Sequence, residues 1–167
     1  IATIIWFKQP SFKRIIVVLV SIFIFQSAYF GTQWMNDKKN ETIVFDVKKG
    51  TLIADRIGKQ VTIYTNDSLK YNWVLKSYLV GNFCEIKKQK TLQNIAFFNS
   101  RKVMIIDSLA IFPKNIKPDI LILRQSPKLN LDRILSIYKP KIIIADASNY
   151  KTYLAVWKRT CMKQKIP

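Results

Sequence analysis

The residue types available for chemistry are limited, because the 167-residue chain contains no histidine. This excludes most zinc-hydrolase sites, Ser-His-Asp triads and histidine-based proton transfer from the sequence. The two cysteines, Cys84 and Cys161, are far apart and have no metal-ligand residue types beside them. Each is interpreted as a buried thiol, and a disulfide between them stays open. No cofactor and no catalytic residue is predicted.

Positive charge is the dominant chemical feature, with 28 Lys and Arg against 10 Asp and Glu and a net charge of +18. Such a charge attracts polyanions, either nucleic acid or an anionic lipid surface. An alternative is biased composition, since the chain is also rich in Asn and Ile. The basic turn before Gly50 and the basic loop at 87–90 could contact phosphates or simply be solvated. The candidate DNA or phosphate contacts are Lys48, Lys49, Lys87, Lys88, Arg124 and Lys128.

Arg124 follows the continuous apolar run 119–123, which is typical of a strand buried on both faces. Ligand crevices in α/β folds open at the carboxyl ends of such strands. Three interpretations of Arg124 remain open: a phosphate-facing side chain, a buried ion pair with Asp146 or Asp107, and an exposed side chain.

The pattern along the chain predicts a mixed α+β or α/β fold. Three β-rich segments from Thr42 to Thr65 predict a meander, and a helix is expected over 69–81 after a cap at 66–68. Two further strands are expected at 94–99 and 102–108. The last third alternates strand and helix, at 119–123, 129–140, 141–146 and 149–167. Trp73, Tyr78 and Trp157 are interpreted as core residues.

A run without charged residues at 15–36, preceded by Lys13 and Arg14, predicts a membrane span. A signal peptide and a buried core helix are the alternatives. The basic loop 7–14 is expected in the cytoplasm, which places the chain after the span on the extracytoplasmic side. The predicted organisation is membrane segments over 1–36, a linker at 37–41 and a soluble domain over 42–167.

Two segments carry a family resemblance. IVFDVKKG (43–50) is similar to a strand and turn that usually reads D-V-G-Q-G-D, and 119–149 resembles V-L-K-V-x-H-H-G-S followed by a KPK unit. In this combination the chain resembles the C-terminal part of ComEC-type competence proteins, which are multi-pass proteins of DNA uptake in natural transformation. The resemblance implies a metallo-β-lactamase-like αββα domain. It also implies the cytoplasmic (inner) membrane, with DNA, the lipid bilayer, and other competence proteins or self-association as partners.

The departures from that family pattern suggest that the metal-hydrolase site has been lost. Arg124, Gln125 and Ser126 stand where the family has His-His-Gly, and the acids at strand ends, such as Asp46 and Asp119, can cap or pair as easily as bind metal. The domain is therefore expected to be a degenerate, non-enzymatic one that guides or structurally supports DNA entry. The alternatives are a metal-dependent nuclease with atypical ligands and a purely structural membrane-anchored module.

Overall fold

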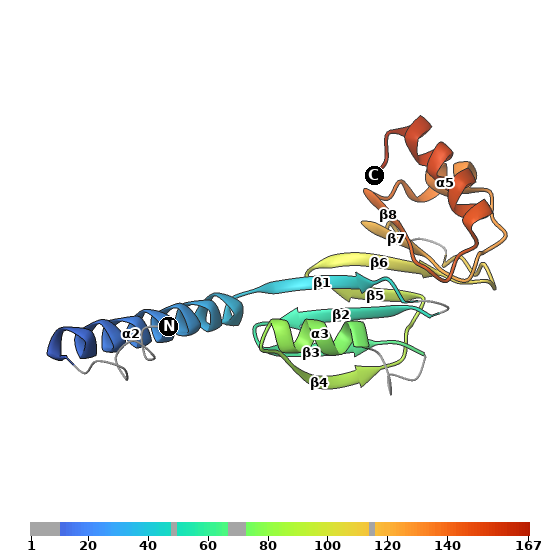
Figure 1. Ribbon diagram of the computed structural model, residues 1–167. Coiled ribbons are helices and arrows are strands. Elements are labelled where there is room, and N and C mark those ends of the chain that lie inside the picture. The colour runs from blue at the N-terminus through green and yellow to red at the C-terminus, as the bar shows by residue number, and fades with distance from the viewer. Residues whose placement is uncertain (1–10, 48–49, 67–72, 114–115) are drawn as a thin grey trace. The chain divides into compact units, whose positions relative to one another are not determined.

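The computed structural model of the protein describes residues 11–47, 50–66, 73–113 and 116–167 (Figure 1). The chain divides into two compact units, Ile1–Lys39 and Asn40–Pro167, and each is considered by itself. The cap predicted at 66–68 falls mostly outside the described residues.

The first unit contains one long helix, α2 (Phe12–Asp37). At 26 residues it extends about 39 Å, enough to cross a hydrocarbon core of about 30 Å. Two of its polar side chains are satisfied within the helix: Ser21 Oγ donates to Val18 O at 2.7 Å, and Thr32 Oγ1 donates to Ala28 O at 2.8 Å. None of its residues is buried. By length and composition, it is the one candidate span within the described residues.

The second unit begins with a four-stranded sheet, here called sheet A. Its strands are β1 (Asn40–Phe45), β2 (Leu52–Ile57), β3 (Gln60–Tyr64) and β4 (Glu85–Lys90), in that spatial order. The first three form the antiparallel meander expected from their patterning, whereas β4 pairs parallel to β3. A parallel partner needs a crossover, which contains α3 (Trp73–Gly81).

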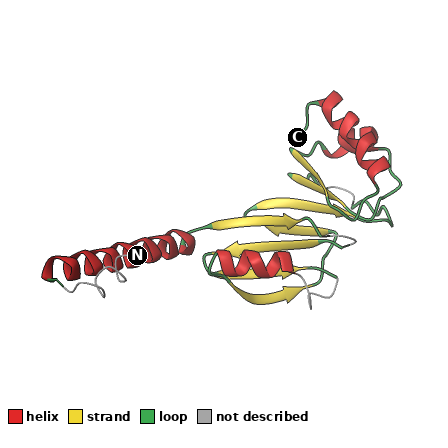
Figure 2. Cartoon of the chain, viewed as in Figure 1, coloured by secondary structure: helices red, strands yellow, loops and turns green. Residues whose placement is uncertain are grey.

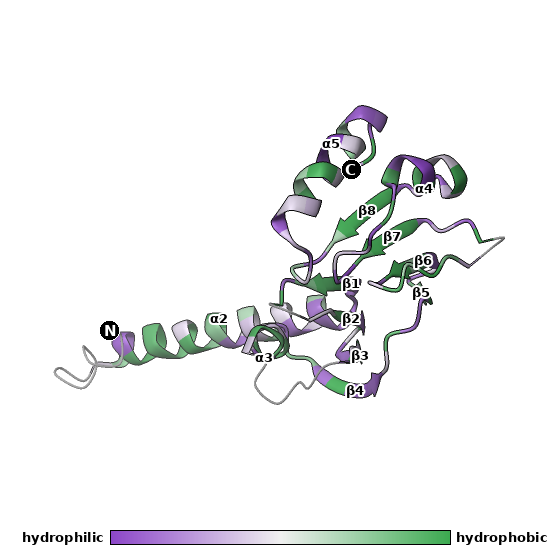
Figure 3. Cartoon of the chain, turned by 90° about the vertical axis from the view of Figure 1, so that its right-hand side faces the viewer, coloured by the Kyte–Doolittle hydropathy of each residue, from purple (hydrophilic) through white to green (hydrophobic). Residues whose placement is uncertain are grey.

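The second sheet, sheet B, combines a hairpin with two parallel strands. Its order is β5 (Ile95–Phe98), β6 (Arg101–Ile106), β7 (Ile120–Leu123) and β8 (Ile142–Ala145). The helix α4 (Leu131–Tyr138) connects β7 to β8, and α5 (Lys151–Gln164) follows β8. The continuous apolar character of β7 and β8 is visible in Figure 3.

Alternation along the strands sends apolar side chains to three separate cores. Leu52 and Ala54 of β2 pack with α3, whereas Ile53 between them packs with Phe98 and Ile122 of sheet B. The outer face of sheet B packs against α4 and α5; this third core contains Met104, Ile106, Leu121, Leu123, Leu131, Ile134, Leu135, Tyr138 and Trp157. Because successive strand residues point to opposite faces, both sheets are covered on two sides.

These cores define the layers of the domain: α3, sheet A, sheet B, and then α4 with α5 (Figure 2). The α+β class with an N-terminal apolar helix is confirmed. The narrower relationship to the metallo-β-lactamase fold stays a prediction.

Two sequence-based expectations were wrong. The basic segment 87–90, expected to be a loop, is part of strand β4. Trp73, expected in the core, is 74% exposed, although Trp157 is buried as expected. Cys84 and Cys161 belong to different cores and form no disulfide with each other.

A buried polar cluster fixes α3 on sheet A. The side chain of Arg56 on β2 is fully buried and its Nη1 lies 3.3 Å from Glu41 Oε1 and 3.0 Å from Asn82 Oδ1. Its Nε donates to Gly58 O at 2.7 Å. The hydroxyl of Tyr78 on α3 donates to Glu41 at 2.7 Å. Burial, followed by this hydrogen bond to Glu41, raises the pKa of Tyr78 to about 12.

The ionisation of Tyr78 provides a test of this cluster. Below pH 10 both folded and unfolded chains keep the phenol neutral, so the contribution of Tyr78 to folding is fully present. Between pH 10 and about 12 the unfolded chain releases this proton first, so stability falls as the pH rises. We expect a late tyrosinate absorbance change that disappears in Tyr78→Phe and moves to lower pH in Glu41→Gln. An unchanged titration in Glu41→Gln would contradict the assigned hydrogen bond.

Candidate nucleic-acid interface

The structure does not gather the six predicted contact residues into one site. Lys48 and Lys49 lie outside the described residues. Lys87 and Lys88 lie on β4, Arg124 directly follows β7, and Lys128 precedes α4. The four described residues thus fall in three places, which differ in burial and in neighbours.

Strand β4 is an exposed cationic edge. Among the described strands it pairs with β3 alone, and all six of its residues are exposed. The register places Ile86 beside Val61 and Lys88 beside Thr62, so Lys87 is an extra residue at a β-bulge. The Lys87 Nζ approaches Gln60 Oε1 at 2.5 Å. Because of the bulge, Lys88 and Lys90 lie on the same face of the sheet as Thr62 and Tyr64.

The lysines after the bulge lie on the face of sheet A that is opposite α3. Val61 and Ile63 of β3 belong to the core under α3, so Thr62 and Tyr64 lie on the other face. Lys88 and Lys90 are their register partners. Lys90 Nζ is 5.7 Å from the centre of the Tyr64 ring, a cation–π distance.

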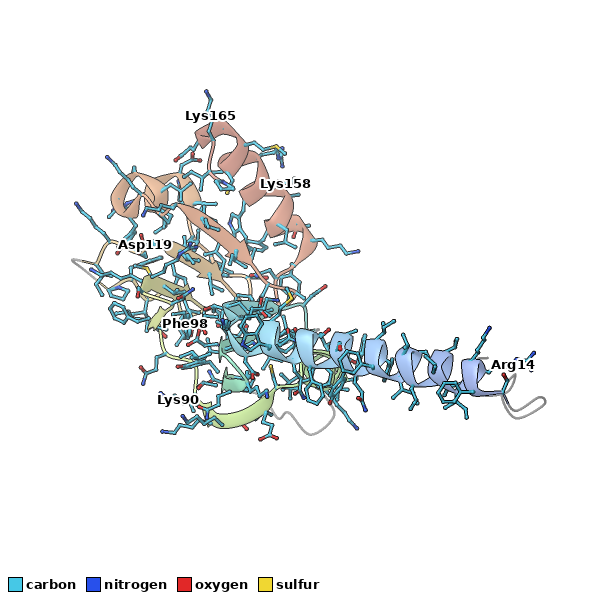
Figure 4. All side chains as sticks on the ribbon, turned by 90° about the vertical axis from the view of Figure 1, so that its left-hand side faces the viewer. Arg14, Lys90, Phe98, Asp119, Lys158 and Lys165 are labelled. Atoms are coloured by element: carbon cyan, nitrogen blue, oxygen red, sulfur yellow. The ribbon has the colours of Figure 1, made fainter. Side chains whose placement is uncertain are left out.

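Tyr64 connects the lysines to the aromatic residues of sheet B. Its ring meets Phe98 edge-to-face, with centroids 4.8 Å apart. Burial, with a smaller effect of Asp55, raises the pKa of Tyr64, so its phenol stays neutral at physiological pH. Figure 4 labels Lys90 and Phe98, which come from β4 and β5. The Tyr64 ring is therefore held in place from two sides.

An open groove of about 550 Å³ lies beside Lys90. Its lining combines one lysine with hydrogen-bonding and aromatic side chains and, among the described residues, includes no carboxylate; the lining residues are Tyr64, Gln89, Lys90, Thr91, Gln93, Ile95, Ala96 and Phe97. Phe97 is 65% exposed. Proteins that bind single-stranded nucleic acid without sequence preference combine positive charge with such aromatic surfaces. We call β4 and this groove together the β4 edge.

A second polar site lies at the carboxyl ends of β7 and β8. Asp146 is buried and accepts hydrogen bonds from Thr51 Oγ1, from the backbone and side chain of Ser148, and from Asn149 Nδ2. Arg124 is only 5% exposed, and its buried Nε has no hydrogen-bond partner. Of the three interpretations of Arg124, the ion pair with Asp146 or Asp107 is absent for these described residues, and an exposed side chain is contradicted by its burial.

The donor set at this site does not fit a two-metal hydrolase centre. Such a centre needs several histidine and carboxylate ligands converging on the ions. Here one carboxylate is already occupied by hydroxyl and amide donors, next to the arginine that follows β7, and the sequence supplies no histidine. Within the described ranges, no group of three or more Cys, Asp or Glu residues is placed to hold a metal. No catalytic step is derived from this site.

Lys128 belongs to a third location, an open pocket of about 1000 Å³ beside α4. Lys117 and Arg133 also line it, over an apolar floor that includes Ile134 and Ile137. This pocket is separate in sequence and in lining residues from the β4 edge.

The sequence-based reasoning missed Tyr64, Gln93 and Phe97 as site residues. Their signal was distributed over two strands and a connection, and β4 itself was hidden by its charge. The pair Phe97 and Phe98 was the usable clue, because adjacent strand residues point to opposite faces, and at the edge strand β5 Phe98 is buried whereas Phe97 is exposed.

The domain is thus an α+β domain that follows an apolar helix and presents a cationic edge. The chain belongs to the ComEC C-terminal domain family, whose family model matches residues 42–167. This confirms the resemblance and gives the chain a role in DNA uptake during competence, in a family of membrane proteins. A comparison with curated proteins found no match, and neither did a comparison with solved structures.

The two buried arginines, Arg124 and Arg56, should respond differently to replacement by methionine. Arg56→Met removes the partner of Glu41 and Asn82, and should lower the free energy of unfolding by about 3–5 kcal/mol. Arg124→Met removes a buried donor, Nε, that has no partner, and should change the free energy of unfolding by no more than about 1 kcal/mol. Chemical unfolding followed by tryptophan fluorescence measures both. A loss for Arg124→Met as large as that for Arg56→Met would contradict this assignment.

Proposed function

We propose that this domain binds DNA without sequence preference along the β4 edge and guides it during uptake. The observation that carries the proposal is the composition of that edge: Lys87, Lys88 and Lys90 on a fully exposed strand, next to a groove that contains Tyr64 and Phe97. Membership of the family links the chain to DNA uptake, and the lysines and aromatic rings of the β4 edge are suited to binding DNA.

Electrostatic attraction is the main source of affinity in this proposal. Lysines that approach phosphates release condensed counterions, and this makes binding strong at low salt and weak at high salt. The net charge of +18 adds long-range attraction that brings the polyanion to the domain.

The aromatic residues add a contribution that depends on unpaired bases. Phe97 is 65% exposed, and an exposed ring beside a lysine suits base stacking, worth roughly 1–3 kcal/mol per base. Duplex DNA keeps its bases stacked inside, so it can use the lysines but not the rings. The β4 edge should therefore prefer single strands.

The proposal also includes a membrane location and the absence of catalysis. The helix α2 is proposed to span the cytoplasmic membrane as part of a multi-pass protein, with the domain on the extracytoplasmic side. Its length and its internally bonded Ser21 and Thr32 support the span. The donor set around Asp146 supports a non-enzymatic role.

Salt dependence provides the test of DNA binding. In the triple variant Lys87→Gln/Lys88→Gln/Lys90→Gln, the slope of log K against log salt for a single strand should fall by about 2, since each phosphate contact contributes about 0.7. Fluorescence anisotropy with a labelled oligonucleotide, over a salt series, measures it on the whole chain in detergent.

A charge-matched control separates the edge from the net charge. Lys151→Gln/Lys158→Gln/Lys163→Gln removes three exposed lysines of α5. It should retain most of the affinity. Equal losses in both triple variants, or no binding by the unaltered chain at low salt, would refute the proposed site.

Catalysis is tested separately. The chain should leave single-stranded and duplex DNA intact when incubated with Mg²⁺, Mn²⁺ or Zn²⁺, as read by gel electrophoresis. Metal-dependent cleavage that is lost in Asp46→Ala or Asp146→Ala would establish the nuclease alternative instead.

A further inference from the structure

A second cationic surface lies where the parallel strands of sheet B begin. Asp119 joins two of its members: Lys102 N donates to Asp119 Oδ2 at 3.1 Å, and Lys141 Nζ lies 3.0 Å from Asp119 Oδ1. Backbone hydrogen bonds from Asp119 to Lys102 and from Lys141 to Asp119 hold the same strands together. Arg101 is adjacent in sequence to Lys102, and Lys117 is two residues before Asp119. We call Arg101, Lys102, Lys117 and Lys141 the basic rim.

The basic rim keeps a net positive charge. All four of its cations are exposed, and Lys141 has 80% of its side chain accessible. Asp119 stays ionised, since the hydrogen bond from Lys102 and the bond to Lys141 lower its pKa. Together with Asp119, the basic rim has four cations and one carboxylate, and the DNA-binding proposal does not use this excess of three positive charges.

The basic rim adjoins the first residues of the domain. Asn40 and Glu41, at the start of β1, line a pocket of about 280 Å³ together with Arg101 and Ile120. Ile120 begins β7 and follows Asp119 directly. The strand that enters the domain and the rim of sheet B therefore meet at the same end of the sheets.

The connection between α2 and β1 is short. Trp34 is 64% exposed near the end of α2, and Lys38 Nζ lies 3.9 Å from its ring centre. Tryptophan rings and lysine side chains of this kind mark the headgroup level of a bilayer. Asn40 is two residues after Lys38, so their Cα atoms are at most about 7 Å apart.

We propose that the basic rim binds the headgroups of anionic phospholipids in the leaflet from which α2 emerges. This lipid-binding proposal rests on the membrane span in the proposed function, and it is independent of the DNA contacts of the β4 edge. The short connection favours lipid over nucleic acid as the partner, because it tethers Asn40, which lines the same pocket as Arg101, within about 7 Å of Lys38. Each cation at an anionic surface strengthens such binding about fivefold.

The expected consequence is a fixed orientation of the domain on anionic membranes. A fluorophore attached to Ser100→Cys, beside Arg101, reports the rim, and one at the exposed Ala147→Cys, after β8, reports the opposite edge. Both are made with Cys161→Ser, since Cys84 is buried. The chain is reconstituted in phosphatidylcholine vesicles with or without phosphatidylglycerol, and a spin-labelled lipid headgroup serves as the quencher.

Quenching of the Ser100→Cys label should increase when phosphatidylglycerol is present, whereas the Ala147→Cys label should not respond. Salt near 1 M, with a Debye length of about 3 Å, should abolish the increase. The variant Arg101→Gln/Lys102→Gln/Lys117→Gln should weaken docking about 100-fold, at about fivefold per cation.

The variant Lys87→Gln/Lys88→Gln/Lys90→Gln, with the same loss of charge, should keep the increase. Equal quenching in both kinds of vesicle, or equal losses in the two triple variants, would overturn the lipid assignment. Displacement of the Ser100→Cys label from anionic vesicles by an oligonucleotide in the β4 variant would instead identify the rim as a nucleic-acid surface. None of these outcomes depends on whether the β4 edge binds DNA.

Discussion

The domain depends on one packing constraint, which is that each sheet must be buried on two faces at once. Strand β2 meets this constraint within three residues, with Leu52 and Ala54 under α3 and Ile53 against sheet B. Because Ile53 is fully buried between Phe98 and Ile122, a shift of β2 by one residue would exchange the two cores. The register of sheet A and the contact between the sheets are therefore set together, and all of the surface sites are positioned by them.

The fold could be predicted wherever apolar periodicity was strong. Strands β7 and β8 and the helix α4 follow directly from their patterns, as do the three strands of the meander. Strand β4 could not be found this way, because EIKKQK has a single apolar residue, and its place in the sheet comes from backbone hydrogen bonding to β3. Trp73 shows the converse limit, since a helical spacing does not reveal which face the next layer covers.

The candidate sites were only partly predictable, for a related reason. The sequence correctly placed Arg124 at the end of a buried strand. It did not predict that Arg124 is buried and that its Nε has no hydrogen-bond partner. An ion pair between Arg124 and Asp146 was one of the open interpretations, and Asp146 is satisfied instead by hydroxyl and amide groups from Thr51, just before β2, and from the turn after β8. Residues with hydroxyl and amide groups are common in any sequence, so the sequence alone does not show which of them meet at one carboxylate. The positive charge predicted a polyanionic partner, but it did not indicate which residues would contact that partner.

The unpaired side of β4 has a consequence for how chains behave on a shared ligand. An open edge strand is a template for pairing with another strand, and lysines on such an edge keep two copies apart by repulsion. The proposed polyanion binding would neutralise this charge on Lys87, Lys88 and Lys90 and leave the backbone groups on that side of β4 available. Two copies on neighbouring stretches of one strand could then approach edge to edge. The lysines that oppose edge-to-edge pairing of free copies would thus allow it on a shared strand, which gives the proposed DNA binding a physical basis for cooperativity.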